Sequence, residues 1–77
     1  MTIAYLLIDC DLGSEESVLE ALKKIEQVKE AFETFGAHDI MVKVESAHLE
    51  ELRETITWKI KKIDKVRATV SLVKKDS

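Results

Sequence analysis

Few side chains in this sequence are placed to do chemistry. The single cysteine, Cys10, lies between Asp9 and Asp11, whose charges disfavour the thiolate, so we predict an inert thiol. The two histidines, His38 and His48, lie in a turn and near a helix start, without the ligand spacing of a metal site. We therefore expect no enzyme activity, no cofactor and no metal. His48 is expected on plain surface, whereas His38 could sense pH or touch a ligand.

The strongest turn signal in the middle of the chain is Gly36-Ala37-His38-Asp39. Glycine permits a positive φ and a close approach of the backbone. An aspartate at such a turn either hydrogen-bonds the local backbone or presents its carboxylate to a ligand. The residues leave both interpretations open, one purely structural and one of ligand binding.

Composition narrows the class of protein. The chain has 77 residues and a formal net charge of −3, with acids and bases spread along it, which argues against nucleic-acid binding. A domain of this size has a marginal core, so we expect association. The start lacks the basic residues of a signal peptide, and no apolar run approaches the ~20 residues of a membrane span, so we predict a cytoplasmic protein. The absence of proline and asparagine, with abundant Glu and Lys, is typical of heat-adapted proteins.

The elements that must position these residues come in two copies. The segment Leu22–Lys29 recurs as Ile60–Arg67, 38 residues further along. A repeat of this kind marks a supersecondary unit, here strand–helix–strand. The predicted fold class is therefore α+β, a ferredoxin-like βαββαβ sandwich. Its four-stranded antiparallel sheet has the first and third strands at the centre and both helices on one face.

Local patterns give the expected bounds of these elements. The strands are predicted over residues 3–10, 28–35, 39–45 and 66–73. The helices follow Ser14 and Ser46, each of which is placed to cap a first turn. The apolar stripe predicted for the second helix is Leu49, Leu52, Ile56, Ile60 and Ile63. The side chains predicted to share one face of the last strand are Val66, Ala68, Val70 and Leu72.

The first strand is apolar on both faces, although two helices can cover only one. Its odd-numbered side chains, Ile3, Tyr5 and Leu7, are predicted on the uncovered face, where a partner sheet in a two-fold homodimer would hide them. A monomer with a few exposed apolar side chains is the alternative. Trp58 falls off the buried stripe of its helix, so it is either an interface anchor or packed on neighbouring lysine stems.

Several segments together resemble one family. They are Ala4–Ile8, Val18-Leu19 with Leu22, Ile25 and Val28, Gly36–Ile40, Leu49 with Leu52, and Ile63–Ser71. In this order they resemble the effector-binding (RAM) domain of leucine-responsive/asparagine-responsive (Lrp/AsnC) transcription regulators, over essentially the whole chain. The most specific piece is Gly-x-x-Asp at Gly36–Asp39. Members usually carry an N-terminal helix-turn-helix domain, whereas here the first strand is expected from residue 3. We therefore interpret residues 1–77 as a single stand-alone effector-binding and oligomerisation domain that does not itself bind DNA.

The resemblance also implies a ligand and an assembly. It implies homodimers formed sheet to sheet, higher oligomers of those dimers, and an amino-acid effector bound between dimers. The ligand residues it implies are Gly36, Ala37, His38, Asp39, Thr69 and Ser71. Ser71 departs from the family's Thr-x-Thr pattern but keeps a hydroxyl. Full-length Lrp/AsnC-type regulators are the expected protein partners.

We predict a non-enzymatic amino-acid-binding module that regulates transcription or amino-acid metabolism through partner regulators. The alternatives are a small ferredoxin-like enzyme, RNA binding on the open sheet, and a purely structural oligomer. Resemblance to an acylphosphatase would imply a site with an arginine and an asparagine. This chain has no asparagine, which argues against that enzyme. RNA binding calls for aromatic side chains on the central strands and basic charge, and here Tyr5 stands alone in an acidic chain.

Overall fold

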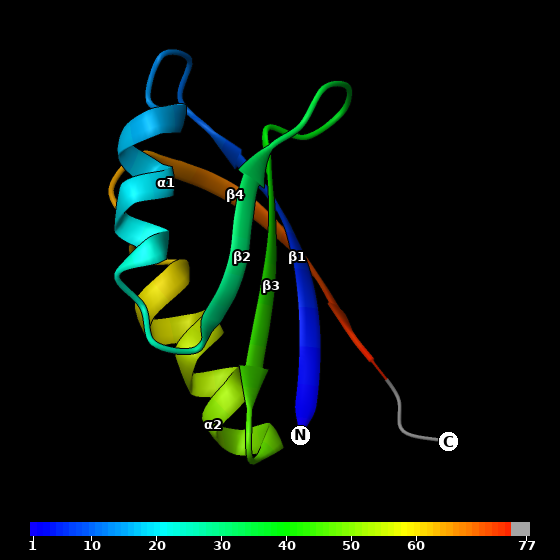
Figure 1. Ribbon diagram of the computed structural model, residues 1–77. Coiled ribbons are helices and arrows are strands. Elements are labelled where there is room, and N and C mark those ends of the chain that lie inside the picture. Colours follow the sequence, from blue (N-terminus) through cyan, green and yellow to red (C-terminus); the bar gives the residue numbers. More distant parts are fainter. Residues whose placement is uncertain (75–77) are drawn as a thin grey trace.

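Strand β1 (Thr2–Cys10) lies inside a four-stranded antiparallel sheet in the computed structural model, which describes residues 1–74. Its neighbours are β3 (Ile40–Ser46) and β4 (Val66–Val73), and β2 (Val28–Glu33) lies beyond β3. The order is β2-β3-β1-β4, as Figure 1 shows. The prediction that the first and third strands occupy the centre is therefore confirmed.

The helices lie together on one face of this sheet (Figure 1). They are α1 (Glu15–Lys23) and α2 (Leu49–Glu54), and the latter continues into a π-helical segment, η1 (Thr55–Ile60). The sequence did not predict the π-helical segment. Its wider turn buries Ile56 and Ile60 just as an α-helix would, so the apolar pattern does not distinguish the two.

Neither serine caps its helix through its side chain as predicted. Ser14 occupies the N-cap position, but its hydroxyl donates to the carbonyl of Asp11. The N-cap of α2 is His48, and Ser46 is the last residue of β3. Ser46 continues the buried alternation of β3, and its buried hydroxyl has no hydrogen-bond partner within residues 1–74.

The core lies between the helices and the face of the sheet that they cover. The strands contribute the buried side chains Ala4, Leu6, Ile8, Cys10, Ile40, Val42 and Val44. The helices contribute Val18, Leu22, Leu52, Ile56 and Ile60. Of the predicted helix stripe, Leu49 is 39% exposed and Ile63 is only partly buried, since they lie at the two ends of the segment. The alternation predicted for the first strand is confirmed, and β3 alternates in the same way.

The strand bounds and one face assignment differ from the prediction. Strand β2 ends at Glu33 because the N–H of Thr34 donates to the carbonyl of Asp39 at 2.9 Å and closes the hairpin. In β4 the prediction of a single shared face is wrong for Val66. It lies opposite the buried Cys10, since the register shifts by one residue between Cys10 and Asp9. A β-bulge of this kind reverses the alternation, which periodicity along one strand does not reveal.

The uncovered face of the sheet, which we call the open face, carries one apolar row of side chains and one row that is partly charged. One row crosses all four strands through Phe32, Met41, Leu7 and Val70. The next row pairs Tyr5 with Leu72 beside Lys43 and Glu30. Val70 is 44% and Leu72 58% exposed. A contiguous apolar surface of this kind indicates an interaction site.

No helix within residues 1–74 is both long and apolar enough to cross a membrane.

The one-sided core makes a direct prediction about stability. Leu22→Ala removes a fully buried side chain and is expected to lower the free energy of unfolding by about 2–5 kcal/mol. Leu12→Ala is the matched control, because Leu12 is 98% exposed and its loss should change the free energy by less than about 0.5 kcal/mol. Urea unfolding at one protein concentration measures both. Equal losses in the two variants would contradict this placement of the core.

Candidate functional site

The hairpin between β2 and β3 projects beyond the end of the sheet (Figure 1). Gly36 has φ of 110°, a conformation that side chains rarely adopt, so glycine is required there. The hydroxyl of Thr34 donates to the carbonyl of His38 at 2.8 Å, which braces the loop from inside. The turn predicted from Gly36-Ala37-His38-Asp39 is therefore present and well ordered by its own hydrogen bonds.

Asp39 joins this hairpin to the end of β1. Its Oδ2 accepts a hydrogen bond from the N–H of Cys10 at 2.9 Å, and its own N–H donates to the carbonyl of Ile8 at 3.0 Å. One carboxylate oxygen of Asp39 therefore has a structural role, because it accepts a backbone hydrogen bond. The other oxygen, Oδ1, has no hydrogen-bond partner within residues 1–74 and can accept from a ligand.

His38 makes a second link between the hairpin and β1. Its Nδ1 lies 3.1 Å from Oδ1 of Asp9, and both side chains are about one-third exposed. The contact is a hydrogen bond with a neutral imidazole and an ion pair with a protonated one. His38 therefore contacts Asp9 rather than standing free at the tip of the turn.

An open cavity of about 370 Å³ lies at this end of the sheet. Its lining residues are Asp9, Cys10, Ala37, Asp39, Arg67 and Ala68. Two carboxylates and one guanidinium thus border a single space, with two alanines leaving it uncrowded. Of the predicted ligand residues, Ala37 and Asp39 line this cavity, whereas Gly36 and His38 do not.

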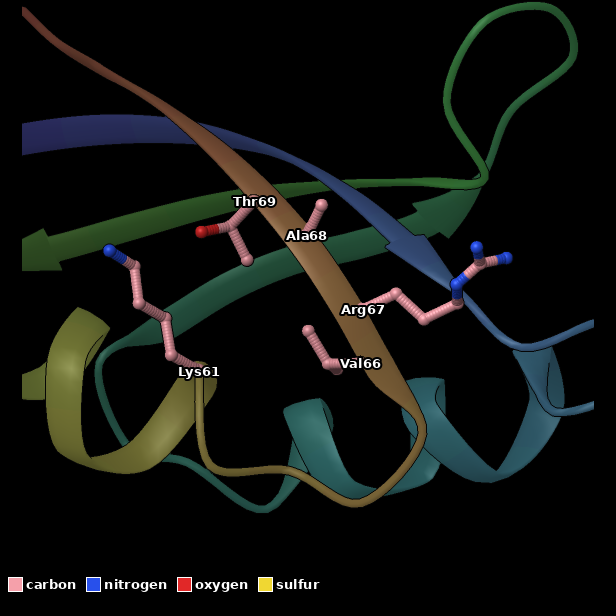
Figure 2. A pocket seen from close by; sticks show the side chains of 5 residues that line it. All are labelled: Lys61, Val66, Arg67, Ala68 and Thr69. Carbon is pink, nitrogen blue, oxygen red and sulfur yellow. The ribbon is translucent and has the colours of Figure 1, made fainter.

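A second open cavity, of about 350 Å³, lies along the start of β4 and shares Arg67 and Ala68 with the first. Figure 2 shows its lining residues, Lys61, Val66, Arg67, Ala68 and Thr69. The hydroxyl of Thr69 is directed toward the side of Lys61, whereas Arg67 extends away from both. Thr69 belongs to the helix side of the sheet because it lies opposite the buried Ile8.

The six predicted ligand residues are therefore divided within one chain. Ser71 lies opposite Leu6, on the same side as Thr69, is exposed and lines neither cavity. The sequence analysis missed Asp9, Arg67 and Lys61. The alternation of β1 already puts Asp9 on the open face and was the available signal, whereas the position of Arg67 depends on the bulge in β4.

Cys10 borders the first cavity but is buried. Burial raises the pKa of the Cys10 thiol, and the charges of Asp39 and Glu15 raise it further. The direction agrees with the predicted inert thiol, but the main cause is burial, and the predicted charge of Asp11 adds only a smaller contribution. A thiol that stays protonated is a poor nucleophile, so Cys10 serves as part of the wall.

The other residues singled out from the sequence lie on the surface. His48 is exposed, and Trp58 is 67% exposed with the ammonium of Lys62 5.7 Å from its ring centroid. This contact supports the packing interpretation of Trp58. The interface role of Trp58 remains a prediction. Within residues 1–74, no group of three or more His, Cys, Asp or Glu side chains is arranged to hold a metal ion.

The fold is thus a small α+β sandwich with an open, charged cavity at the hairpin end of its sheet. Comparison with known proteins then gives the family: the chain belongs to the Lrp/AsnC ligand binding domains, whose family model matches residues 3–74. It is 36% identical over 67 residues to an uncharacterised HTH-type transcriptional regulator of Pyrococcus abyssi. It is 33% identical to a second such regulator, of Pyrococcus horikoshii. The matched part is 87% of this chain and 42% of each of these relatives.

Solved structures agree with this assignment. The structure of FFRP-DM1 has a TM-score of 0.92 and 35% identity, with 96% of this chain and 99% of that chain covered. A hypothetical protein from Pyrococcus horikoshii has a TM-score of 0.93 and 34% identity, covering 100% of this chain and 93% of that one. AsnC of E. coli has a TM-score of 0.90 and 25% identity, covering 99% of this chain and 52% of that one. The chain is therefore a regulatory effector-binding module of the kind found in transcription regulators.

The hydrogen bond from Cys10 to Asp39 can be tested apart from any ligand. Asp39→Ala leaves the part-buried N–H of Cys10 without its acceptor, which should lower the free energy of unfolding by about 1–3 kcal/mol. Asp39→Asn keeps a side-chain oxygen in place and should recover most of that loss. Urea unfolding of both variants measures the difference. Equal losses would mean that the charge of Asp39, rather than its hydrogen bond, stabilises the hairpin.

Proposed function

We propose that this chain binds an amino acid at the hairpin end of its sheet and associates through the open face, without enzyme activity. The observation that carries the proposal is the cavity bordered by Asp9, Asp39 and Arg67. A free amino acid is a zwitterion, so its site needs an acceptor for the ammonium group and a donor for the carboxylate. The cavity offers groups of both signs, and the membership of a ligand-binding family supports this use of it.

The open face supports the proposed homodimer. Apolar side chains cross all four strands there, and the two of them on the edge strand β4, Val70 and Leu72, are about half exposed. Burying them against an identical sheet removes apolar surface from both copies. Ile3, Tyr5 and Leu7 lie on this face, as predicted, and are the central members of the proposed interface.

The divided ligand residues support a further association of dimers. Thr69 and Ser71 do not meet the Gly36–Asp39 turn within one chain. The family resemblance implies an effector held between dimers. The hydroxyls of Thr69 and Ser71 would then reach the effector from a different copy than the one that supplies the turn. We place the assembly in the cytoplasm, acting with full-length Lrp/AsnC-type regulators that supply the DNA-binding domain.

A structural oligomer without ligand is the second candidate, and one observation favours it. Asp39 already has a task in the fold, because its Oδ2 holds the N–H of Cys10. A turn from Gly36 to Asp39 whose role was only to form this hydrogen bond would need the same residues, with no ligand bound.

A thermal-shift screen separates these two functions. We expect at least one standard L-amino acid to raise the melting temperature by several degrees, since a ligand at one hundred times its Kd adds about 2.7 kcal/mol. Asp39→Asn should weaken that shift, because it removes the charge but keeps an acceptor for Cys10. Glu54→Gln on α2, an exposed carboxylate that lines neither cavity, is the control. No shift with any amino acid would favour the structural oligomer.

Substitution on the open face tests the dimer. The native protein is expected at a multiple of the 8.8 kDa chain mass in size-exclusion chromatography with light scattering. Val70→Lys puts a charge into the proposed interface and should shift the mass toward 8.8 kDa, without unfolding, since Val70 is 44% exposed. Leu12→Lys, in the loop before α1, should leave the mass unchanged. A native protein that is monomeric at micromolar concentration would contradict the proposal.

A further inference from the structure

The start of β4 is built around one extra residue. Cys10 lies opposite Val66 and Asp9 lies opposite Ala68, so Arg67 has no partner in β1. The N–H of Asp11 donates to the carbonyl of Lys65 at 2.9 Å, which ties the start of β4 to the end of β1. Bulges of this kind re-aim a side chain and are frequent beside binding sites. The bulge therefore fixes where the side chain of Arg67 begins.

Arg67 lines both cavities, and only the first of them also contains Asp9 and Asp39. Figure 2 shows its side chain extending away from Lys61 and Thr69, toward the end of β1. Its ion-pair contact within residues 1–74 is loose and exposed, with Nε 3.8 Å from Oδ1 of Asp11. The two terminal nitrogens of the guanidinium are left to donate to a ligand.

The carboxylates across the cavity are each half engaged. Asp9 uses Oδ1 toward His38, and Asp39 uses Oδ2 toward Cys10. Within residues 1–74 the second oxygen of each has no hydrogen-bond partner, so it is left for another donor. The cavity thus combines the positively charged guanidinium of Arg67, a donor, with two negatively charged carboxylates, which are acceptors. All three groups lie at the ends of paired strands.

We propose that Arg67 binds the α-carboxylate of the amino-acid effector, while the remaining oxygens of Asp9 and Asp39 accept from its ammonium group. This rests on the function proposed above and deepens it by naming the group that selects the ligand class. A planar guanidinium takes a carboxylate through two parallel hydrogen bonds, which an uncharged amide cannot reproduce. The effector is then a free α-amino acid, and its carboxamide binds more weakly.

Calorimetric titration of the whole chain with standard L-amino acids and with their α-carboxamides tests this assignment. The native protein is expected to bind the amino acid at least about tenfold more tightly than the matching carboxamide. Arg67→Gln should lose at least about tenfold in affinity for the amino acid and no longer distinguish it from the carboxamide. Arg67 is mostly exposed, so the variant should fold with an unchanged melting temperature.

Two variants serve as controls. Arg53→Gln removes the same charge at the other arginine of the chain, on α2, and should bind like the native protein. Lys61→Gln removes the cation that lines only the second cavity and should also leave affinity and selectivity unchanged.

The outcomes separate this inference from the proposed function. Amino-acid binding that survives Arg67→Gln with its selectivity intact overturns the role of Arg67 and leaves the proposed function standing. Loss of binding in Lys61→Gln but not in Arg67→Gln also overturns it and moves the carboxylate to the second cavity. If the native protein binds no amino acid, both proposals fail together.

Discussion

Strand β1 is apolar on both faces, yet the helices cover only one of them. The covered face packs Ala4, Leu6 and Ile8 into the core, and the odd-numbered side chains remain on the other side. A sheet in this position cannot satisfy both faces within one short chain, because two helices make a single layer. The architecture of the monomer and its proposed association thus follow from the same strand.

The ends of the central strands carry the candidate site for a related reason. Side chains there are held by the register of the sheet, whereas the loops beyond it supply backbone groups and small residues. Asp39 shows how the two requirements are combined, since one oxygen accepts from the N–H of Cys10 and the other has no partner within residues 1–74. Positions supported in this way keep their geometry without a ligand, which reduces the entropy lost on binding.

The edge strand β4 borders two cavities of different character, and Arg67 and Ala68 line both of them. The first also contains the carboxylates of Asp9 and Asp39, whereas the second contains Lys61 and Thr69. The bulge at Arg67 changes the direction of the side chains at the start of this strand. Arg67 therefore borders both cavities, whereas Thr69, two residues further on, borders only the second (Figure 2).

The sequence by itself determined the order of the elements, the two central strands and the buried face of each. These features depend on local periodicity, on the internal repeat and on the handedness of strand–helix–strand units, all of which are written along the chain. The turn at Gly36 could likewise be predicted, because a positive φ requires a glycine there.

Only the tertiary structure decided what surrounds that turn. The bond from Asp39 to Cys10 and the contact of His38 with Asp9 each join residues 29 positions apart. The place of Arg67, and the separation of Thr69 from Asp39, follow from a one-residue shift between β1 and β4. Such contacts depend on the register between distant strands, and no pattern within a single strand specifies that register.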